Sequence, residues 1–153
     1  RAISNYYFTY KNNLETRNID EVFLKDTSPP PVSKNISVSP FNYIERGFYI
    51  NYLKNFYAIF DTDKIKIVIL EKLLSKEYNE LKSLFTFFGL RHNNQAYNIL
   101  EEKQNSNLIN YDTDKLKPVI QKLTNIYKTS VEKLENYLNI NLSIWKNEFI
   151  SKY

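Results

Sequence analysis

Apolar residues recur at spacings of three and four near both ends of the chain, which is the period of an amphipathic helix. Residues 2–12 predict an opening helix that buries Ile3, Tyr6, Tyr7 and Tyr10. A short helix is expected at residues 20–24. A long helix is expected to begin at Pro118, because proline is tolerated in a first helical turn. Its apolar positions are Val119, Ile120, Leu123, Ile126, Tyr127, Val131, Leu134, Tyr137 and Leu138.

The middle of the chain alternates helical and extended patterns. Residues 49–60 predict a helix whose aromatic stripe we interpret as core rather than as a platform for stacking bases. That stripe consists of Tyr49, Leu53, Phe56 and Phe60. A further helix is expected to be capped by Ser75 and to stop at Gly89, a residue suited to the left-handed position after a helix. Its buried residues are expected to be Tyr78, Leu81, Leu84, Phe85 and Phe88.

Residues 65–70 are short, β-branched and apolar on both faces except at Lys66. This pattern is typical of a strand covered by helices on both sides, as in a parallel sheet. A helix, a buried strand and a second helix in succession predict a unit of an α/β protein.

Two polar segments interrupt these elements. Three consecutive prolines, Pro29 to Pro31, make residues 27–40 a loop, which could form the rim of a binding cleft or be a plain connector. Residues 91–117 form a loop longer than compact domains usually contain, and such loops tend to be functional or disordered.

The composition predicts one globular domain, since 42% of the 153 residues are hydrophobic and 25% are charged. Cysteine is absent, which excludes disulfides, thiolate metal sites and cysteine nucleophiles. No apolar run approaches the roughly 20 residues that cross a bilayer. The chain has two glycines and no Gly-rich phosphate loop.

The net charge of +4 raises the alternative of a basic helical module that binds nucleic acid or protein without catalysis. That alternative requires Lys and Arg to gather on one face. Instead, Lys residues alternate with acidic ones, as at Glu132 and Lys133, which is typical of a solvated helix face. We therefore expect no nucleic-acid partner.

Several short motifs occur in an order that resembles one enzyme family. The chain opens Arg1-x-x-Ser4-x-Tyr6, and residues 43–53 read Tyr-x-x-Arg-Gly-x-Tyr-x-x-x-Leu. Residues 67–73 end in Glu-Lys-Leu, residues 87–90 read Phe-Phe-Gly-Leu, and residues 141–145 read Asn-Leu-Ser-Ile-Trp. In this order they resemble the C-terminal half of a sulfotransferase that uses 3′-phosphoadenosine 5′-phosphosulfate (PAPS), of the type that includes heparan-sulfate and bacterial enzymes. Lys72 and Asn141 stand where this family has Asp.

The resemblance implies an α/β fold, of which this chain is the mostly helical C-terminal part of a P-loop-like domain with one or two parallel strands. Residues 1–153 would then be a single partial domain whose N-terminal half is missing. The absence of Met agrees with a fragment that begins inside a structural element. The lack of cysteine favours a cytoplasmic bacterial relative over a Golgi enzyme, and membrane association through an upstream segment stays open.

The resemblance also implies site residues. Ser4, Arg1 and Lys103 would bind the PAPS cofactor at its 3′-phosphate, and Arg46 and Tyr49 would bind the sulfate acceptor, a carbohydrate or another small hydroxyl compound. Catalytic residues and metal ligands are not expected within this chain. Each assignment has a plain structural alternative: Ser4 as an ordinary helix residue, Lys103 as a solvated lysine, and Arg46 as the ion-pair partner of a nearby glutamate.

Overall fold

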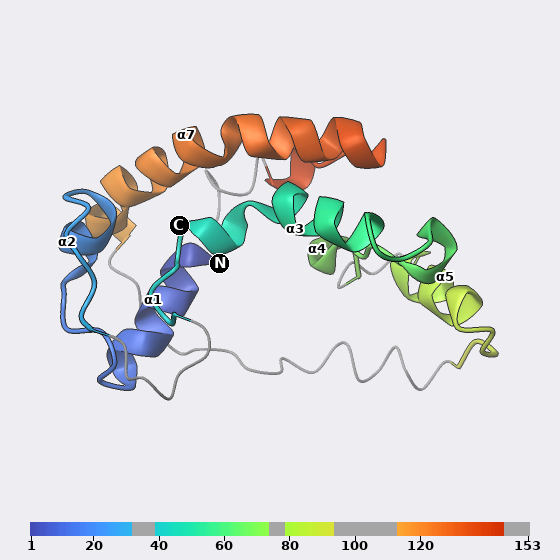
Figure 1. Ribbon diagram of the computed structural model, residues 1–153, viewed down its shortest axis with the longest axis horizontal. Coiled ribbons are helices and arrows are strands. Elements are labelled where there is room, and N and C mark those ends of the chain that lie inside the picture. The colour runs from blue at the N-terminus through green and yellow to red at the C-terminus, as the bar shows by residue number, and fades with distance from the viewer. Residues whose placement is uncertain (32–38, 74–78, 94–112, 146–153) are drawn as a thin grey trace. The chain divides into compact units, whose positions relative to one another are not determined.

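The computed structural model describes residues 1–31, 39–73, 79–93 and 113–145 (Figure 1). The chain divides into two compact units. The first unit comprises Arg1–Asn55 and Tyr111–Tyr153, and the second comprises Phe56–Asn110. The first contains α1 (Ala2–Lys11), α2 (Ile19–Phe23), most of α3 (Tyr49–Tyr57) and α7 (Thr113–Leu138). The second contains α4 (Leu70–Leu73) and α5 (Asn79–Phe87).

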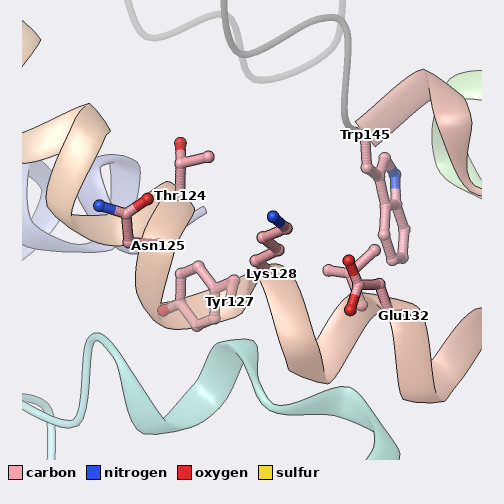
Figure 2. A pocket seen from close by; sticks show the side chains of 7 residues that line it. Thr124, Asn125, Tyr127, Lys128, Glu132 and Trp145 are labelled. Carbon is pink, nitrogen blue, oxygen red and sulfur yellow. The ribbon is translucent and has the colours of Figure 1, made fainter.

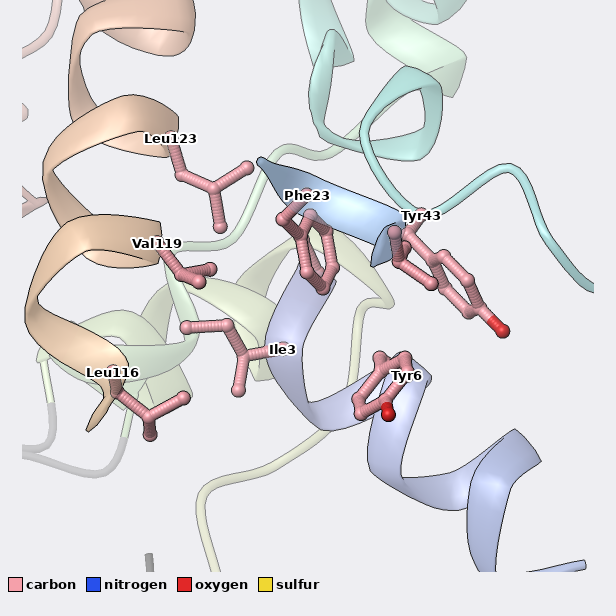
Figure 3. Packing of buried hydrophobic residues seen from close by; sticks show 9 residues of the cluster. Ile3, Tyr6, Phe23, Tyr43, Leu116, Val119 and Leu123 are labelled. Carbon is pink, nitrogen blue, oxygen red and sulfur yellow. The ribbon is translucent and has the colours of Figure 1, made fainter. Parts of the chain in front are cut away.

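The core of the first unit lies where α1, α2 and α7 meet (Figure 3). Phe23 is completely buried at its centre, and the Tyr6 and Tyr43 rings meet the Phe23 ring with centroids 5.9 Å away in each case. The remaining members are Ala2, Ile3, Val22, Leu116, Val119 and Leu123. The helical period of the opening segment therefore identified the buried face of α1 correctly at Ile3 and Tyr6, but Tyr7 is only partly buried and Tyr10 is 48% exposed.

The long helix α7 begins five residues before the predicted start, so Pro118 lies inside it. Proline lacks the N–H that would bond to the Asp114 carbonyl, a cost that must be offset by packing. Leu116 and Val119 on either side of the proline are fully buried, and α2 packs against the helix. Tertiary packing thus keeps Pro118 inside α7, although proline is better tolerated in the first turn of a helix.

Three of the described helices end in the same hydrogen-bonded motif. Gly89 follows α5 with φ of 65°, its N–H donates to the Thr86 carbonyl, and the N–H of Leu90 donates to the Phe85 carbonyl. This is the Schellman arrangement, and it confirms the predicted glycine stop. Asn13 after α1 and Asn139 after α7 take the same left-handed conformation with equivalent bonds. The predicted apolar face of the helix before Gly89 is wrong, since α5 has no buried residue and Phe88 is 64% exposed.

The predicted strand at 65–70 is wrong. Residues 65–69 belong to no helix or strand, and Leu70 already begins α4. A strand needs a neighbouring strand to pair its backbone groups, and the described residues contain none. The described part of the chain is therefore mostly helical, and the expected parallel strands are absent from it.

The aromatic stripe of the helix at 49–60 is less buried than predicted. The helix ends at Tyr57, and Ile50 is its buried residue. Phe56 and Phe60 are 54% and 50% exposed and stack on each other with ring centroids 6.3 Å apart. The predicted cap at Ser75 lies outside the described residues. Among the described helices, none is long and apolar enough to cross a membrane.

Candidate functional site

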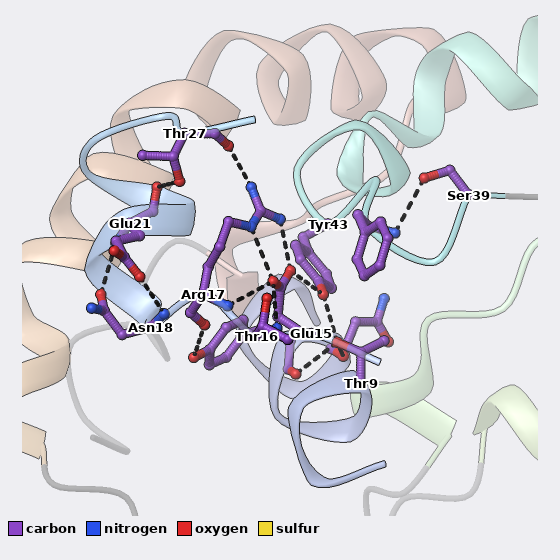
Figure 4. A network of polar contacts seen from close by, with 12 residues as sticks. Thr9, Glu15, Thr16, Arg17, Asn18, Glu21, Thr27, Ser39 and Tyr43 are labelled. Carbon is purple, nitrogen blue, oxygen red and sulfur yellow. Dashed lines mark hydrogen bonds and ion pairs between the residues drawn. The ribbon is translucent and has the colours of Figure 1, made fainter. Parts of the chain in front are cut away.

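The turn after α1 contains a buried acidic residue that sequence patterns did not single out (Figure 4). Glu15 is 2% exposed, and its Oε1 accepts hydrogen bonds from the backbone N–H groups of Thr16 and Arg17, each at 3.0 Å. The Arg17 guanidinium binds both carboxylate oxygens, with Nη2 2.6 Å from Oε2 and Nε 3.0 Å from Oε1. The Arg17 guanidinium also donates to the Thr27 carbonyl, and this contact joins the turn to the segment after α2.

Two hydroxyl groups complete this network. The Tyr43 hydroxyl donates to Glu15 Oε2 at 3.0 Å and lies 2.5 Å from Thr9 Oγ1. Tyr43 gives its single proton to Glu15, and the single proton of Thr9 is shared between Tyr43 and the Tyr6 carbonyl, which lies 2.8 Å from Thr9 Oγ1. Burial and the bond to Glu15 raise the pKa of Tyr43 to about 12, so it stays a donor. The hydrogen bonds thus connect α1, the following turn and the segment before α3.

The charge state of Glu15 follows from the same contacts. Burial by itself would raise the pKa of the carboxyl group, because it removes water from the charged form. Hydrogen bonds from the Arg17 side chain and backbone and from Tyr43 outweigh burial, and they lower the pKa below its ordinary value of 4.5. Glu15 is therefore an ionised, fully bonded group, which suits a structural role better than proton transfer.

Arg46, predicted to bind the acceptor, lies with Gly47 in a 3₁₀ turn (Glu45–Gly47) that contacts α7. Arg46 Nη2 donates to the Ser39 carbonyl at 2.8 Å. A Cβ built on Gly47 would lie 2.5 Å from the Tyr127 ring, and the Tyr127 hydroxyl donates to the Ile44 carbonyl at 2.8 Å. The glycine therefore allows the close approach of a tyrosine from α7.

Tyr49, the other predicted acceptor residue, is half-buried at the start of α3 and contacts Trp145 with ring centroids 5.8 Å apart. Trp145 in turn borders a cavity of about 350 Å³ on α7 (Figure 2). The other lining residues are Thr124, Asn125, Tyr127, Lys128, Val131 and Glu132. Close to Trp145 in the sequence, Leu142 is fully buried, while Trp145 itself is half-buried.

The predicted phosphate-binding residues occupy the first turn of α1. Arg1 is the N-cap residue and Ser4 the third residue of the helix, and both side chains are exposed. No side chain caps this helix, and its first turn contains no acidic residue. Arg1 and Ser4 thus lie within one turn of each other, whereas Arg46 and Tyr49 belong to a different segment. Lys103 lies outside the described residues.

Other groups that sites often use are solvated or paired. His92 is exposed and contacts the Phe85 ring, with ring centroids 5.8 Å apart. In the described ranges, no three acidic or histidine side chains are grouped as metal ligands would be. Several cations pair with carboxylates at 2.6–2.8 Å, among them Arg17, Lys64, Lys117 and Lys122. These pairs lend no support to a face reserved for nucleic acid.

Comparison with known proteins gave no relatives: no family model, curated protein or solved structure matches this chain.

Proposed function

We propose that this chain forms the nucleotide-binding C-terminal part of a PAPS-dependent sulfotransferase, in which the first turn of α1 binds the 3′-phosphate. The observation that carries the proposal is the exposed Ser4 hydroxyl in an uncapped first turn, with the guanidinium-bearing Arg1 immediately before the helix. The ordered motifs from Arg1 to Trp145 add the family resemblance.

The chemistry of the turn suits a phosphate. A helix presents backbone N–H groups without intrahelical partners at its first turn, together with the positive end of its dipole. A serine hydroxyl and an arginine add a neutral donor and a charge-assisted one. Since the chain has no Gly-rich phosphate loop, we propose that it binds only the 3′-phosphate end of the cofactor.

In this proposal, sulfuryl transfer from PAPS would leave 3′-phosphoadenosine 5′-phosphate and a sulfated hydroxyl or amine of the acceptor. Catalysis would depend mainly on positioning and charge neutralisation, as in phosphoryl transfer. Arg46 uses one guanidinium donor for the Ser39 carbonyl, and its remaining donors would serve an acceptor, with Tyr49 nearby in sequence. We further propose a cytoplasmic enzyme whose acceptor is a carbohydrate or another small hydroxyl compound.

Calorimetric titration with 3′-phosphoadenosine 5′-phosphate tests the proposal. A Ser4→Ala variant should bind about 10- to 150-fold more weakly, because a hydrogen bond to a charged group contributes about 1.5–3 kcal/mol. Ser28→Ala is the matched control, since Ser28 is also exposed but lies in the loop after α2. The isomer with its phosphate on the 2′-oxygen should show no loss from Ser4→Ala. Equal affinities of the wild-type protein and the Ser4→Ala variant would contradict the assignment.

A further inference from the structure

The cavity on α7 combines an apolar wall with polar groups on one face of a helix. Thr124, Tyr127, Lys128 and Val131 follow one another at spacings of three and one, so they share a face of α7. Its volume of about 350 Å³ falls at the lower end of the range of roughly 300–1,000 Å³ for small-molecule sites. A ligand of one ring and a short chain is the size that such a space admits.

The two aromatic side chains that line the cavity, Trp145 and Tyr127, are fixed by contacts with residues outside the cavity. Trp145 is tilted by 46° against the Tyr49 ring, with centroids 5.8 Å apart. Tyr127 is fixed by its hydrogen bond to the Ile44 carbonyl and by an edge contact with the Phe48 ring at 5.4 Å. Two aromatic side chains with restricted rotamers offer a ring-binding surface at little cost in conformational entropy.

The charged groups of the cavity have opposite signs and lie one turn apart. Lys128 and Glu132 occupy positions i and i+4 of α7, where Cβ atoms are separated by about 5–6 Å. They form no ion pair with each other or with any other residue in the described ranges. Figure 2 shows Glu132 beside the Trp145 ring and Lys128 on the preceding turn of α7.

We propose that this cavity binds the zwitterion of a free aromatic α-amino acid such as phenylalanine. The ligand carboxylate would meet the Lys128 ammonium, its ammonium would meet the Glu132 carboxylate, and its ring would pack on Trp145 and Val131. A ligand with one charge leaves either Lys128 or Glu132 without a counter-charge, and a neutral sugar leaves both. The proposal does not depend on the proposed sulfotransferase activity.

The single tryptophan of the chain provides the readout. Indole fluorescence of the whole protein is titrated with L-phenylalanine, 3-phenylpropionate, phenethylamine and glucose, none of which carries an indole. We expect a saturable change with phenylalanine and at least roughly tenfold weaker binding of the two single-charge analogues, corresponding to about 1.4 kcal/mol. Glucose should cause no change. Calorimetry with phenylalanine repeats the test without the indole signal.

Matched variants locate the ligand. Lys128→Gln should weaken phenylalanine binding roughly tenfold, whereas Lys133→Gln, an exposed α7 lysine outside the cavity lining, should leave it unchanged. Lys128→Gln should also leave binding of 3′-phosphoadenosine 5′-phosphate unchanged, so failure of this proposal and failure of the phosphate site are distinguishable. Absence of phenylalanine binding by both methods, equal effects of the two variants, or binding of glucose alone would overturn the proposal.

Discussion

At the scale of single residues, Gly47 and Glu15 make contacts that are unusual for their residue types. Gly47 lies under the Tyr127 ring, and Glu15 is an ionised carboxylate buried among five hydrogen bonds. Both join segments that are far apart in the sequence. Substitution of either residue should therefore change stability in a way that substitution of an exposed glycine or glutamate would not.

Gly47→Ala should destabilise the fold by about 1–3 kcal/mol, because its methyl group would overlap the Tyr127 ring at 2.5 Å. Chemical denaturation measures the change in the free energy of unfolding. In a Tyr127→Ala background, the same substitution should cost much less, since the ring that it meets is gone. Equal costs in the two backgrounds would refute the close contact.

Glu15 makes the free energy of unfolding depend on pH in the acidic range. Its pKa in the folded protein is lowered from 4.5, so the unfolded chain takes up the proton first as the pH falls. The stabilisation is complete above about pH 4.5 and is lost as the pH falls through the folded-state value. Glu15→Gln should cost roughly 1–3 kcal/mol at neutral pH and flatten the acid limb of the stability curve.

Denaturant unfolding between about pH 6 and pH 3 checks this dependence. The control is Glu132→Gln, an exposed carboxylate without an ion pair in the described ranges. It should keep the acid limb of the wild-type protein. An unchanged acid limb in Glu15→Gln would mean that Glu15 is not the group responsible.

At the scale of elements, hydrogen bonds at helix ends compensate for short lengths. The five-residue helix α2 begins with a capping box, in which the Glu21 N–H donates to Asn18 Oδ1 at 2.9 Å and the Asn18 N–H donates to Glu21 Oε2 at 2.7 Å. So short a helix would not form alone in water. Its stability comes from these caps and from packing against α7.

Asn18→Ala should therefore lower the free energy of unfolding by about 1 kcal/mol, because one helical N–H loses its acceptor. Asn18→Asp retains a carboxyl oxygen at the same position and should lose little. Denaturant midpoints of the two variants make the comparison. A loss in Asn18→Asp as large as that in Asn18→Ala would contradict a capping role.

The same scale shows what the sequence can and cannot predict. The period of residues 2–12 and the Gly89 stop were sufficient for α1 and for the end of α5, because both signals are local. The strand at 65–70 was predicted from apolar, β-branched residues alone, although a strand exists only with a partner. The start of α7 was misplaced because burial of Leu116 and Val119 outweighs the preference of Pro118.

Candidate site residues likewise divide into those that local sequence motifs indicate and those that only the folded structure brings together. Ser4, Arg46 and Tyr49 were proposed as site residues from ordered motifs, and Ser4 lies in the first turn of α1. Glu15 and Arg17 could not be named, since a glutamate and an arginine two residues apart look like surface charges until the fold buries them. The cavity beside Trp145 likewise depends on residues that the fold brings to α7 from a later segment.

At the scale of the whole molecule, the chain consists of two units that differ in their burial. The first has a continuous core around Phe23, whereas the second exposes large apolar side chains such as Phe60 and Phe88. All proposed ligand contacts in the described residues belong to the first unit. Mutations that disrupt this core should therefore also weaken binding of the proposed ligands.

The most direct test of the central claim is an amide chemical-shift titration of isotope-labelled protein with 3′-phosphoadenosine 5′-phosphate. If the first turn of α1 binds the 3′-phosphate, the largest shifts should occur at the amides of Ala2, Ile3 and Ser4 and should saturate with the calorimetric affinity. Saturating shifts confined to other residues, or no shifts in the presence of excess nucleotide, would contradict the claim.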